Sequence, residues 1–184
     1  MLILASASPR RHELLLAAGI SHIVRFTTVQ ETRLEKEPPL EYVKRVAEEK
    51  ARAIHAPEDD IVLGADTTVC LDGEVLGKPT GTEDAARMLR LLSGRDHWVH
   101  TGICLLWKDS RIIDSATTKV SFMPLTKREI EEYTRSGEPF DKAGAYAIQG
   151  LASRFVSGIE GCYHNVVGLP VSLVYQHLKA LCGA

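Results

Sequence analysis

The chain has 184 residues, of which 45% are hydrophobic and 25% charged, and these proportions exclude a disordered or fibrous protein. Its 22 basic and 24 acidic side chains give a formal net charge of -2. No overall basic field therefore exists to hold nucleic acid or an anionic membrane, and any anion site must be local.

No membrane segment or signal peptide is expected from the sequence. Apolar runs such as Leu14 to Ala18 fall far short of the ~20 residues that span a bilayer. The apolar start, Met1 to Ala5, lacks a basic leader and runs into Arg10 and Arg11, which is not the layout of a signal peptide. We therefore expect a soluble, cytoplasmic protein.

Hydrophobic periodicity and turn residues predict a mixture of strands and helices. In chain order these are a strand over Leu2–Ala5, a helix from Pro9 to Gly19, a loop over Thr32–Pro39, a helix over Leu40–Ile54, a strand over Ile61–Leu63, a hairpin of Thr68–Leu71 and Glu74–Leu76, a helix from Thr82 to Leu92, strands over His97–Trp107 and Arg111–Met123, a helix from Thr126 to Ser136, and a last helix from Pro170.

Local signals set these boundaries. Ser8 is a candidate N-cap followed by proline at the first helical position, and Thr82 can cap a later helix. Asp72-Gly73 favours a type I′ turn, and Thr126 with Glu129 forms a capping box. Crossover connections mixed with hairpins predict one α/β domain over residues 1–184, with a mixed sheet flanked by helices.

The cysteines and a histidine pair give no disulfide or zinc signal. No C-x-x-C pair occurs among the widely spaced Cys70, Cys104, Cys162 and Cys182. His97 and His100 lie three residues apart in a predicted strand, so their side chains should point to opposite faces of the sheet.

The segment from Ser6 to Arg11 is a candidate phosphate site. Its small side chains let a ligand approach the backbone where a helix begins, and Arg10 and Arg11 add charges suited to bidentate phosphate contact. The alternative is that Ser8 only caps the helix and that both arginines are solvated.

Three further residues could carry chemistry. Asp66, in Gly64-Ala65-Asp66-Thr67, stands at a predicted strand–loop junction, where it can bind Mg²⁺, accept a proton from water, or simply make a turn. Lys78 can bind phosphate or be merely exposed. Gln149, in the irregular stretch Glu138 to Gly150, can read a base edge or serve as a buried amide that satisfies loop backbone.

Short motifs also occur together, in one order, over nearly the whole chain. They are Ser6-Ala7-Ser8-Pro9-Arg10-Arg11, Gly64-Ala65-Asp66-Thr67, Gly77-Lys78-Pro79, Ser93-Gly94-Arg95, Thr101-Gly102, Glu138-Pro139, Asp141-Lys142-Ala143-Gly144-Ala145-Tyr146, Ile148-Gln149-Gly150 and Asn165-Val166-Val167-Gly168-Leu169-Pro170. Together they resemble the Maf (septum-formation) family. The resemblance implies a nucleoside triphosphate pyrophosphatase that uses a divalent cation, Mg²⁺ or Mn²⁺, and has the mixed-sheet, ITPase/Maf-like fold of the house-cleaning enzymes.

The resemblance also implies roles for individual residues. Asp66 matches the proton acceptor that activates water for attack on the α-phosphorus, and Glu31 and Asp66 match the metal region. The positions associated with substrate choice match Arg11, Thr67 and Gln149. The positions around the phosphates match Ser8, Arg10, Lys50 and Lys78.

Within the family, Arg11, Thr67 and Gln149 resemble the branch that hydrolyses dTTP and UTP. Gln149 could pair with the imide edge that thymine and uracil share, so one site could accept both bases. Modified pyrimidine triphosphates are also candidate substrates. One departure is Gln30, which stands where the family usually has the first member of an acidic pair near the end of its second strand. Its neutral side chain removes a possible negative charge near the metal.

Two other functions stay open on the sequence alone. One is a nucleotide or nucleic-acid binder that regulates cell division or septum formation without turnover, and the other is a metal-dependent phosphatase that releases orthophosphate. A protein that only binds nucleotide has no need of Asp66 beside a phosphate site. The negative charge of Asp66 repels the phosphates there unless a metal ion lies between them. We expect a nucleoside triphosphate as the substrate, no nucleic-acid partner, and a monomer or homodimer.

Overall fold

The structure is a computed structural model that describes residues 1–25 and 28–183, leaving aside the side chain of Cys182. Its helices and strands in chain order are β1 (Leu2–Ala5), α1 (Pro9–Ala17), β2 (His22–Val24), α2 (Pro39–Arg52), β3 (Ile61–Leu71), β4 (Glu74–Leu76), α3 (Thr82–Leu92), β5 (Asp96–Trp107), β6 (Ser110–Phe122), α4 (Lys127–Arg135), β7 (Val156–Glu160), α5 (Tyr163–Val167) and α6 (Val171–Cys182). Short 3₁₀ helices lie over Glu138–Asp141, Ala143–Ala145 and Leu151–Phe155. Among the described residues, no helix has the length and apolar character needed to cross a membrane.

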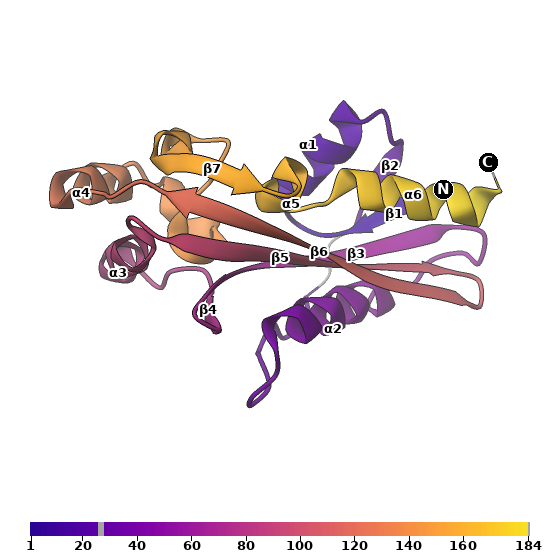
Figure 1. Ribbon diagram of the computed structural model, residues 1–184. Helices are drawn as coiled ribbons and strands as arrows, with labels where there is room; N and C mark the ends of the chain where they lie inside the picture. The colour runs from indigo at the N-terminus through magenta and orange to yellow at the C-terminus, as the bar shows by residue number, and fades with distance from the viewer. Residues whose placement is uncertain (26–27, 184) are drawn as a thin grey trace. The chain divides into compact units, whose positions relative to one another are not determined.

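The sheet is mixed, as the sequence predicts. Its seven strands in the described part of the chain follow the order β2-β1-β3-β5-β6-β7, and β4 pairs with β3 (Figure 1). β1 is parallel to both β2 and β3, whereas β4 is antiparallel to β3 and β7 is antiparallel to β6. Parallel pairs need crossover helices and antiparallel pairs allow hairpins, so the α/β class is confirmed.

The chain forms two compact units. The first unit comprises Met1–Thr67, Thr101–Ala116 and Gly168–Ala184, and the second comprises Thr68–His100 and Thr117–Val167. Strands β3, β5 and β6 each contribute residues to both units.

In the first unit, helices cover both faces of the sheet (Figure 1). One face packs against α1 and α6, in a cluster of Leu2, Leu4, Leu15, Ile61, Leu63, Ala65, Ile103, Leu105, Leu169 and Val174. The other face packs against α2, in a cluster of Ala5, Ala47, Ala51, Val62 and Cys104. Successive strand residues point to opposite faces, so odd and even positions of β3 divide between the two clusters.

Two glycines bring α2 very close to the strands. A Cβ atom at Gly64 would lie 2.1 Å from the carbonyl oxygen of Ala47, and one at Gly102 would lie 2.4 Å from the carbonyl oxygen of Val43. Any side chain at either position would therefore push the helix away. Gly64 lies inside the continuous strand β3, so the predicted strand–loop junction at this point is wrong. Glycine within a strand marks either a bulge or bend or a close approach of another backbone, and Gly64 marks the close approach of α2.

The second unit has an aromatic core. The His97 ring lies 5.0 Å from that of Phe122 and 5.3 Å from that of Tyr146, and the rings of Phe155 and Tyr133 are 5.4 Å apart. The Nε2 atom of His97 is hydrogen-bonded to the Tyr146 hydroxyl at 2.8 Å. Burial lowers the pKa of His97 to about 4, which keeps this ring neutral at pH 7.

Several local predictions are confirmed. Thr126 and Glu129 form the reciprocal capping box of α4. Asp72 and Gly73 have φ values of 52° and 83°, as a type I′ turn requires. His97 is buried whereas the histidine three residues later is partly exposed, in keeping with opposite faces. The described cysteine side chains, those of Cys70, Cys104 and Cys162, form no disulfide bond.

Other local predictions are wrong at the residue level. The N-cap position of α3 is Gly81, so Thr82 is the first helical residue and does not cap the helix. Ser8 occupies the N-cap position of α1, but its side chain makes no capping hydrogen bond. The short elements β2, β7 and α5 were not predicted.

Candidate active site

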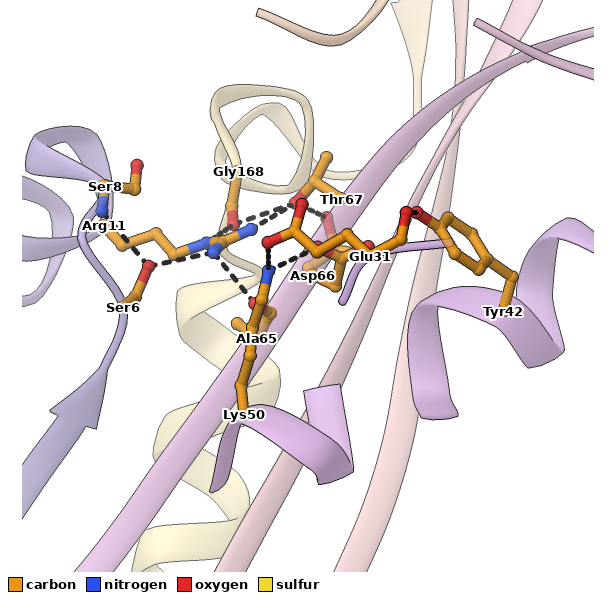
Figure 2. Close-up of polar contacts among 11 residues, drawn as sticks. Ser6, Ser8, Arg11, Glu31, Tyr42, Lys50, Ala65, Asp66, Thr67 and Gly168 are labelled. Carbon is orange, nitrogen blue, oxygen red and sulfur yellow. Dashed lines mark hydrogen bonds and ion pairs between the residues drawn. The ribbon is translucent and has the colours of Figure 1, made fainter. Parts of the chain in front are cut away.

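The candidate site lies in the first unit, around residues 64–67 of β3. The strand presents Asp66 toward α2 and Thr67 toward the opposite face, because neighbouring strand residues alternate. Each of the two side chains meets a cationic residue, Lys50 for Asp66 and Arg11 for Thr67 (Figure 2). Two polar clusters are thus built on adjacent residues of one strand.

The first cluster is centred on Lys50, whose side chain comes from α2. Its Nζ atom lies 2.7 Å from Asp66 Oδ1 and 2.6 Å from Glu31 Oε1, so both carboxylates converge on one ammonium group (Figure 2). The side chains of Lys50 and Asp66 are only 10% and 8% exposed, whereas that of Glu31 is 41% exposed. One carboxylate is therefore buried against the lysine and the other reaches it from the solvent side.

The charge state of Asp66 reflects opposing influences. Burial raises its pKa above the ordinary value, while the positive charges of Lys50 and Arg11 lower it, and the negative charge of Glu31 raises it further. The net direction is upward, so Asp66 is more basic than an exposed aspartate. A buried carboxylate of raised pKa is suited to accepting a proton.

The second cluster is centred on the buried guanidinium of Arg11. It donates from Nε to the carbonyl oxygen of Gly168 at 2.8 Å and from Nη1 to that of Ala65 at 2.9 Å. It also donates to Ser6 Oγ at 3.0 Å and, from Nη2, to Thr67 Oγ1 at 3.0 Å. Burial lowers the pKa of Arg11, but a guanidinium stays protonated in proteins at ordinary pH. The alternative of a solvated Arg11 is therefore wrong.

Thr67 connects this cluster to the chain segment before α6. Its hydroxyl accepts from Arg11 and donates to the carbonyl oxygen of Gly168 at 3.1 Å. Its Oγ1 also lies 2.9 Å from Thr101 Oγ1. Because the single Thr67 proton is used by Gly168, Thr101 is the donor in that pair. Arg11 and Thr67 together fix the backbone of Gly168 to β3.

The remaining predicted residues of the first unit lie nearby on the same elements. Ser8 is partly buried at the start of α1, and its N–H donates to Ser6 Oγ at 3.2 Å. Arg10 is partly buried, in the first turn of the same helix. Glu31 follows β2 in an irregular segment, and neither Gln30 nor Glu31 is in a strand.

Lys78 and Gln149 belong to the second unit, and both are exposed. The alternative of Gln149 as a buried amide is therefore wrong. The loop that carries Gln149 is fastened by Glu138, whose carboxylate accepts from the Tyr133 hydroxyl at 2.7 Å and from the N–H of Leu151 at 3.0 Å. An ordered loop with an exposed amide is what a base-reading residue needs.

Two residues that shape the site were not predicted from the sequence. Tyr42 lies within the helix predicted over Leu40–Ile54 and was given no role there, yet its hydroxyl donates to the carbonyl oxygen of Glu31 at 3.2 Å. Burial raises the pKa of Tyr42 to about 12, so this hydroxyl keeps its proton. Arg45, on the same helix, binds the loop that follows Glu31. Only the i,i+4 spacing of Arg45 and Glu49 could have drawn attention to it.

Comparisons with known proteins agree with the motifs. The family model described as Maf-like protein matches residues 1–181. The chain is 50% identical over 179 residues to a protein from Koribacter versatilis (strain Ellin345) named dTTP/UTP pyrophosphatase, covering 97% of this chain and 93% of that protein. It is 52% identical over 183 residues to a protein of the same name from Anaeromyxobacter sp. (strain Fw109-5), covering 97% and 88%.

The architecture also has a counterpart among solved structures. The Staphylococcus aureus Ham1 protein superimposes with a TM-score of 0.54 at 14% sequence identity, and the match covers 97% of this chain and 98% of that one. At this level of identity the likeness shows a shared fold, and the expected fold is confirmed.

Proposed function

Because the chain belongs to the Maf family, we propose that it hydrolyses dTTP and UTP to the nucleoside monophosphate and pyrophosphate. The structural observation that carries this proposal is the buried Asp66 carboxylate, held 2.7 Å from Lys50 Nζ beside a second carboxylate. Relatives that are half identical over nearly the whole chain carry the name of this activity.

Asp66 is the proposed proton acceptor. Attack on the α-phosphorus requires water to lose a proton, and a carboxylate with a raised pKa takes that proton more readily than an exposed one. The attack breaks the bond between the α-phosphorus and the bridging oxygen, and pyrophosphate leaves with the electron pair of that bond. Phosphoryl transfer needs mostly positioning and charge neutralisation, so the cationic groups around Asp66 suit the reaction.

A divalent cation fits the two carboxylates that converge on Lys50. Carboxylate oxygens are the ligands that Mg²⁺ and Mn²⁺ prefer, and Mg²⁺ usually keeps several waters, so two protein ligands can suffice. Within residues 1–25 and 28–183, no three His, Cys, Asp or Glu side chains gather as a fuller metal site. Glu31 and Asp66 would hold the cation, which would neutralise charge on the phosphates, and Lys50 would then release at least one of its two carboxylates.

Substrate choice is assigned to two kinds of residue. Four of the five N–H groups of Arg11 are engaged within the protein, so we propose that Arg11 and Thr67 act by fixing the Gly168 segment. The exposed amide of Gln149 is proposed to pair with the imide edge of the pyrimidine. The proposed phosphate-binding residues are Ser8, Arg10, Lys50 and Lys78.

The test is an assay of the purified protein with Mg²⁺ or Mn²⁺ against canonical and modified nucleoside triphosphates, with all products separated by chromatography. Pyrophosphate together with dTMP or UMP supports the proposal. Orthophosphate with a nucleoside diphosphate would move the attack to the terminal phosphorus. Binding without turnover would favour a regulator of cell division.

We also propose that the 184 residues act as one domain, in the cytoplasm, as a monomer or homodimer. Three strands contribute to both compact units, which supports a single cooperative folding transition. Light scattering after size-exclusion chromatography measures the oligomeric state, and coincident loss of near- and far-ultraviolet circular dichroism on heating tests the single domain.

A further inference from the structure

We propose that Arg45 and Glu37 form a brace that positions the Glu31 carboxylate for a divalent cation. The inference rests on the proposed function, because it concerns the cation of that reaction. Arg45 and Glu37 thus have a positioning role, and none of their hydrogen bonds given below involves Asp66 or Lys50.

The brace is a bidentate ion pair between α2 and the segment that follows Glu31. Arg45 Nε lies 2.7 Å from Glu37 Oε1, and Arg45 Nη2 lies 2.9 Å from Glu37 Oε2. This fork geometry fixes both the distance and the orientation of the two groups. The Glu37 side chain is only 10% exposed, and its bond to Arg45 lowers its pKa, so the pair stays charged at neutral pH.

The brace reaches the backbone directly beside Glu31. Arg45 Nη2 also donates to the carbonyl oxygen of Thr32 at 3.0 Å, and Tyr42 donates to the carbonyl oxygen of Glu31. Two successive carbonyl groups are thus tied to α2, the helix that carries Lys50. Helix α2 therefore holds both the backbone beside the Glu31 carboxylate and the Lys50 ammonium group that this carboxylate faces.

Glu37 also organises the segment from within. Its carboxylate accepts from the N–H of Leu34 at 3.0 Å, and its carbonyl oxygen accepts from Arg33 Nε at 2.7 Å. The segment therefore closes on itself at Glu37, and Arg45 fastens the closed turn to the helix. The ion pair of Glu31 with Lys50 is a weaker restraint, because the Glu31 side chain is 41% exposed. A partly exposed ion pair contributes little to ordering a loop.

Arg45 offers an internal control. Its Nη1 atom donates to Glu49 Oε1 at 2.8 Å, one turn along α2. Glu49 is thus a second carboxylate on the same guanidinium, but both residues lie on the helix and their bond does not hold the loop. Glu37→Gln and Glu49→Gln each remove one negative charge from Arg45, and only Glu37→Gln loosens the segment beside Glu31.

The experiment measures Mn²⁺ affinity by electron paramagnetic resonance, which reports free Mn²⁺ in solution without any turnover. Glu37→Gln should raise the Mn²⁺ dissociation constant about tenfold, as loss of outer contacts to metal ligands does, whereas Glu49→Gln should change it less than twofold. In a Glu31→Gln background, Glu37→Gln should add no further loss, because the brace acts through Glu31. Arg45→Lys keeps the charge, removes the fork, and serves if Glu37→Gln does not fold.

The outcomes separate the two proposals. Equal Mn²⁺ affinity in Glu37→Gln and Glu49→Gln overturns the brace, as does an additive loss in the Glu31→Gln background, or a wild-type protein that binds no Mn²⁺. A lowered melting temperature with unchanged affinity would also overturn it, since a purely structural ion pair would give that result. The predicted affinity differences in a protein that hydrolyses no nucleotide would support the brace and refute the proposed function.

Discussion

The two compact units of this protein bury opposite kinds of side chain. The first unit encloses charges, because Arg11, Lys50 and Asp66 are all buried. The second unit encloses rings, including the buried His97 and Tyr146, and burial keeps His97 neutral. Buried ions tend to cost stability compared with apolar residues of similar size, whereas buried rings contribute to it. Charged groups suited to chemistry are thus buried in the first unit, whereas the buried rings of the second unit serve packing.

The largest expected effect comes from removing the proposed proton acceptor. Asp66→Asn keeps the size of the side chain but cannot accept the proton, so kcat should fall about 10³-fold while nucleotide still binds. Steady-state kinetics and equilibrium binding measure the two parts. The control is Asp114→Asn, which changes a partly exposed aspartate paired with His177. A variant at Asp66 with unchanged kcat would remove this residue from its role.

The next effect tests how strongly the buried carboxylates depend on the charge of Lys50. Lys50→Met leaves two converging carboxylates without their cation, so unfolding in urea should require about 3 kcal/mol less. Added Mn²⁺ should restore part of this loss, because the cation replaces the ammonium. Lys44→Met removes a more exposed lysine of the same helix, paired with Glu41, and should cost less than about 1 kcal/mol. Equal losses for the two lysines would contradict the comparison.

The ring-filled unit should respond to acid through His97. Its folded pKa of about 4 lies below the ordinary value of 6.5, so the unfolded chain takes up a proton that the folded chain refuses. The corresponding stability is present above pH ~6.5 and is lost as the pH falls toward 4.

Between pH 7.5 and pH 5, wild-type protein should therefore lose about 2 kcal/mol more than the His97→Gln variant. Urea unfolding at the two pH values, with both proteins in the same buffers, measures the difference. Parallel curves for the two proteins would show that His97 titrates normally in the folded state.

The smallest expected effect concerns base selection by the exposed amide of the second unit. Gln149→Glu places a negative charge where pyrimidine carbonyls are proposed to lie, so kcat/KM for dTTP and UTP should fall about tenfold relative to GTP. Gln176→Glu adds the same charge at an exposed position of α6 and should leave the ratio unchanged. If both variants shift the ratio equally, net charge and not base contact is responsible.

The sequence predicts the fold well because its strongest signals are local. The capping box at Thr126, the turn at Asp72-Gly73 and the period of α2 depend on neighbouring residues alone. The position of Asp66 was read as a strand end because Gly64 suggested a loop. That error arises because the glycine is required by a helix distant in the sequence, which no local pattern reveals.

The candidate site was predictable only in part for the same reason. Motif resemblance named Lys50, Asp66 and Glu31, and the structure places all three in contact. Resemblance could not show that the Arg11 guanidinium donates to two backbone carbonyl groups, since main-chain acceptors leave no trace in the sequence. Nor could resemblance reveal the role of Glu37. This residue precedes α2, and its partner Arg45 lies eight residues further along the chain, so no helical spacing links the two.

The contact of α2 with the strands at Gly64 and Gly102 bears on how this protein can diverge in sequence. Main-chain atoms set the separation of helix and sheet there, so replacing side chains elsewhere on α2 does not change it. The distance between Lys50 and Asp66 then depends on the contact between the backbones of α2 and the strands, and not on the particular apolar residues around them. We therefore expect substitutions elsewhere on α2 to leave this site intact, provided that both glycines stay.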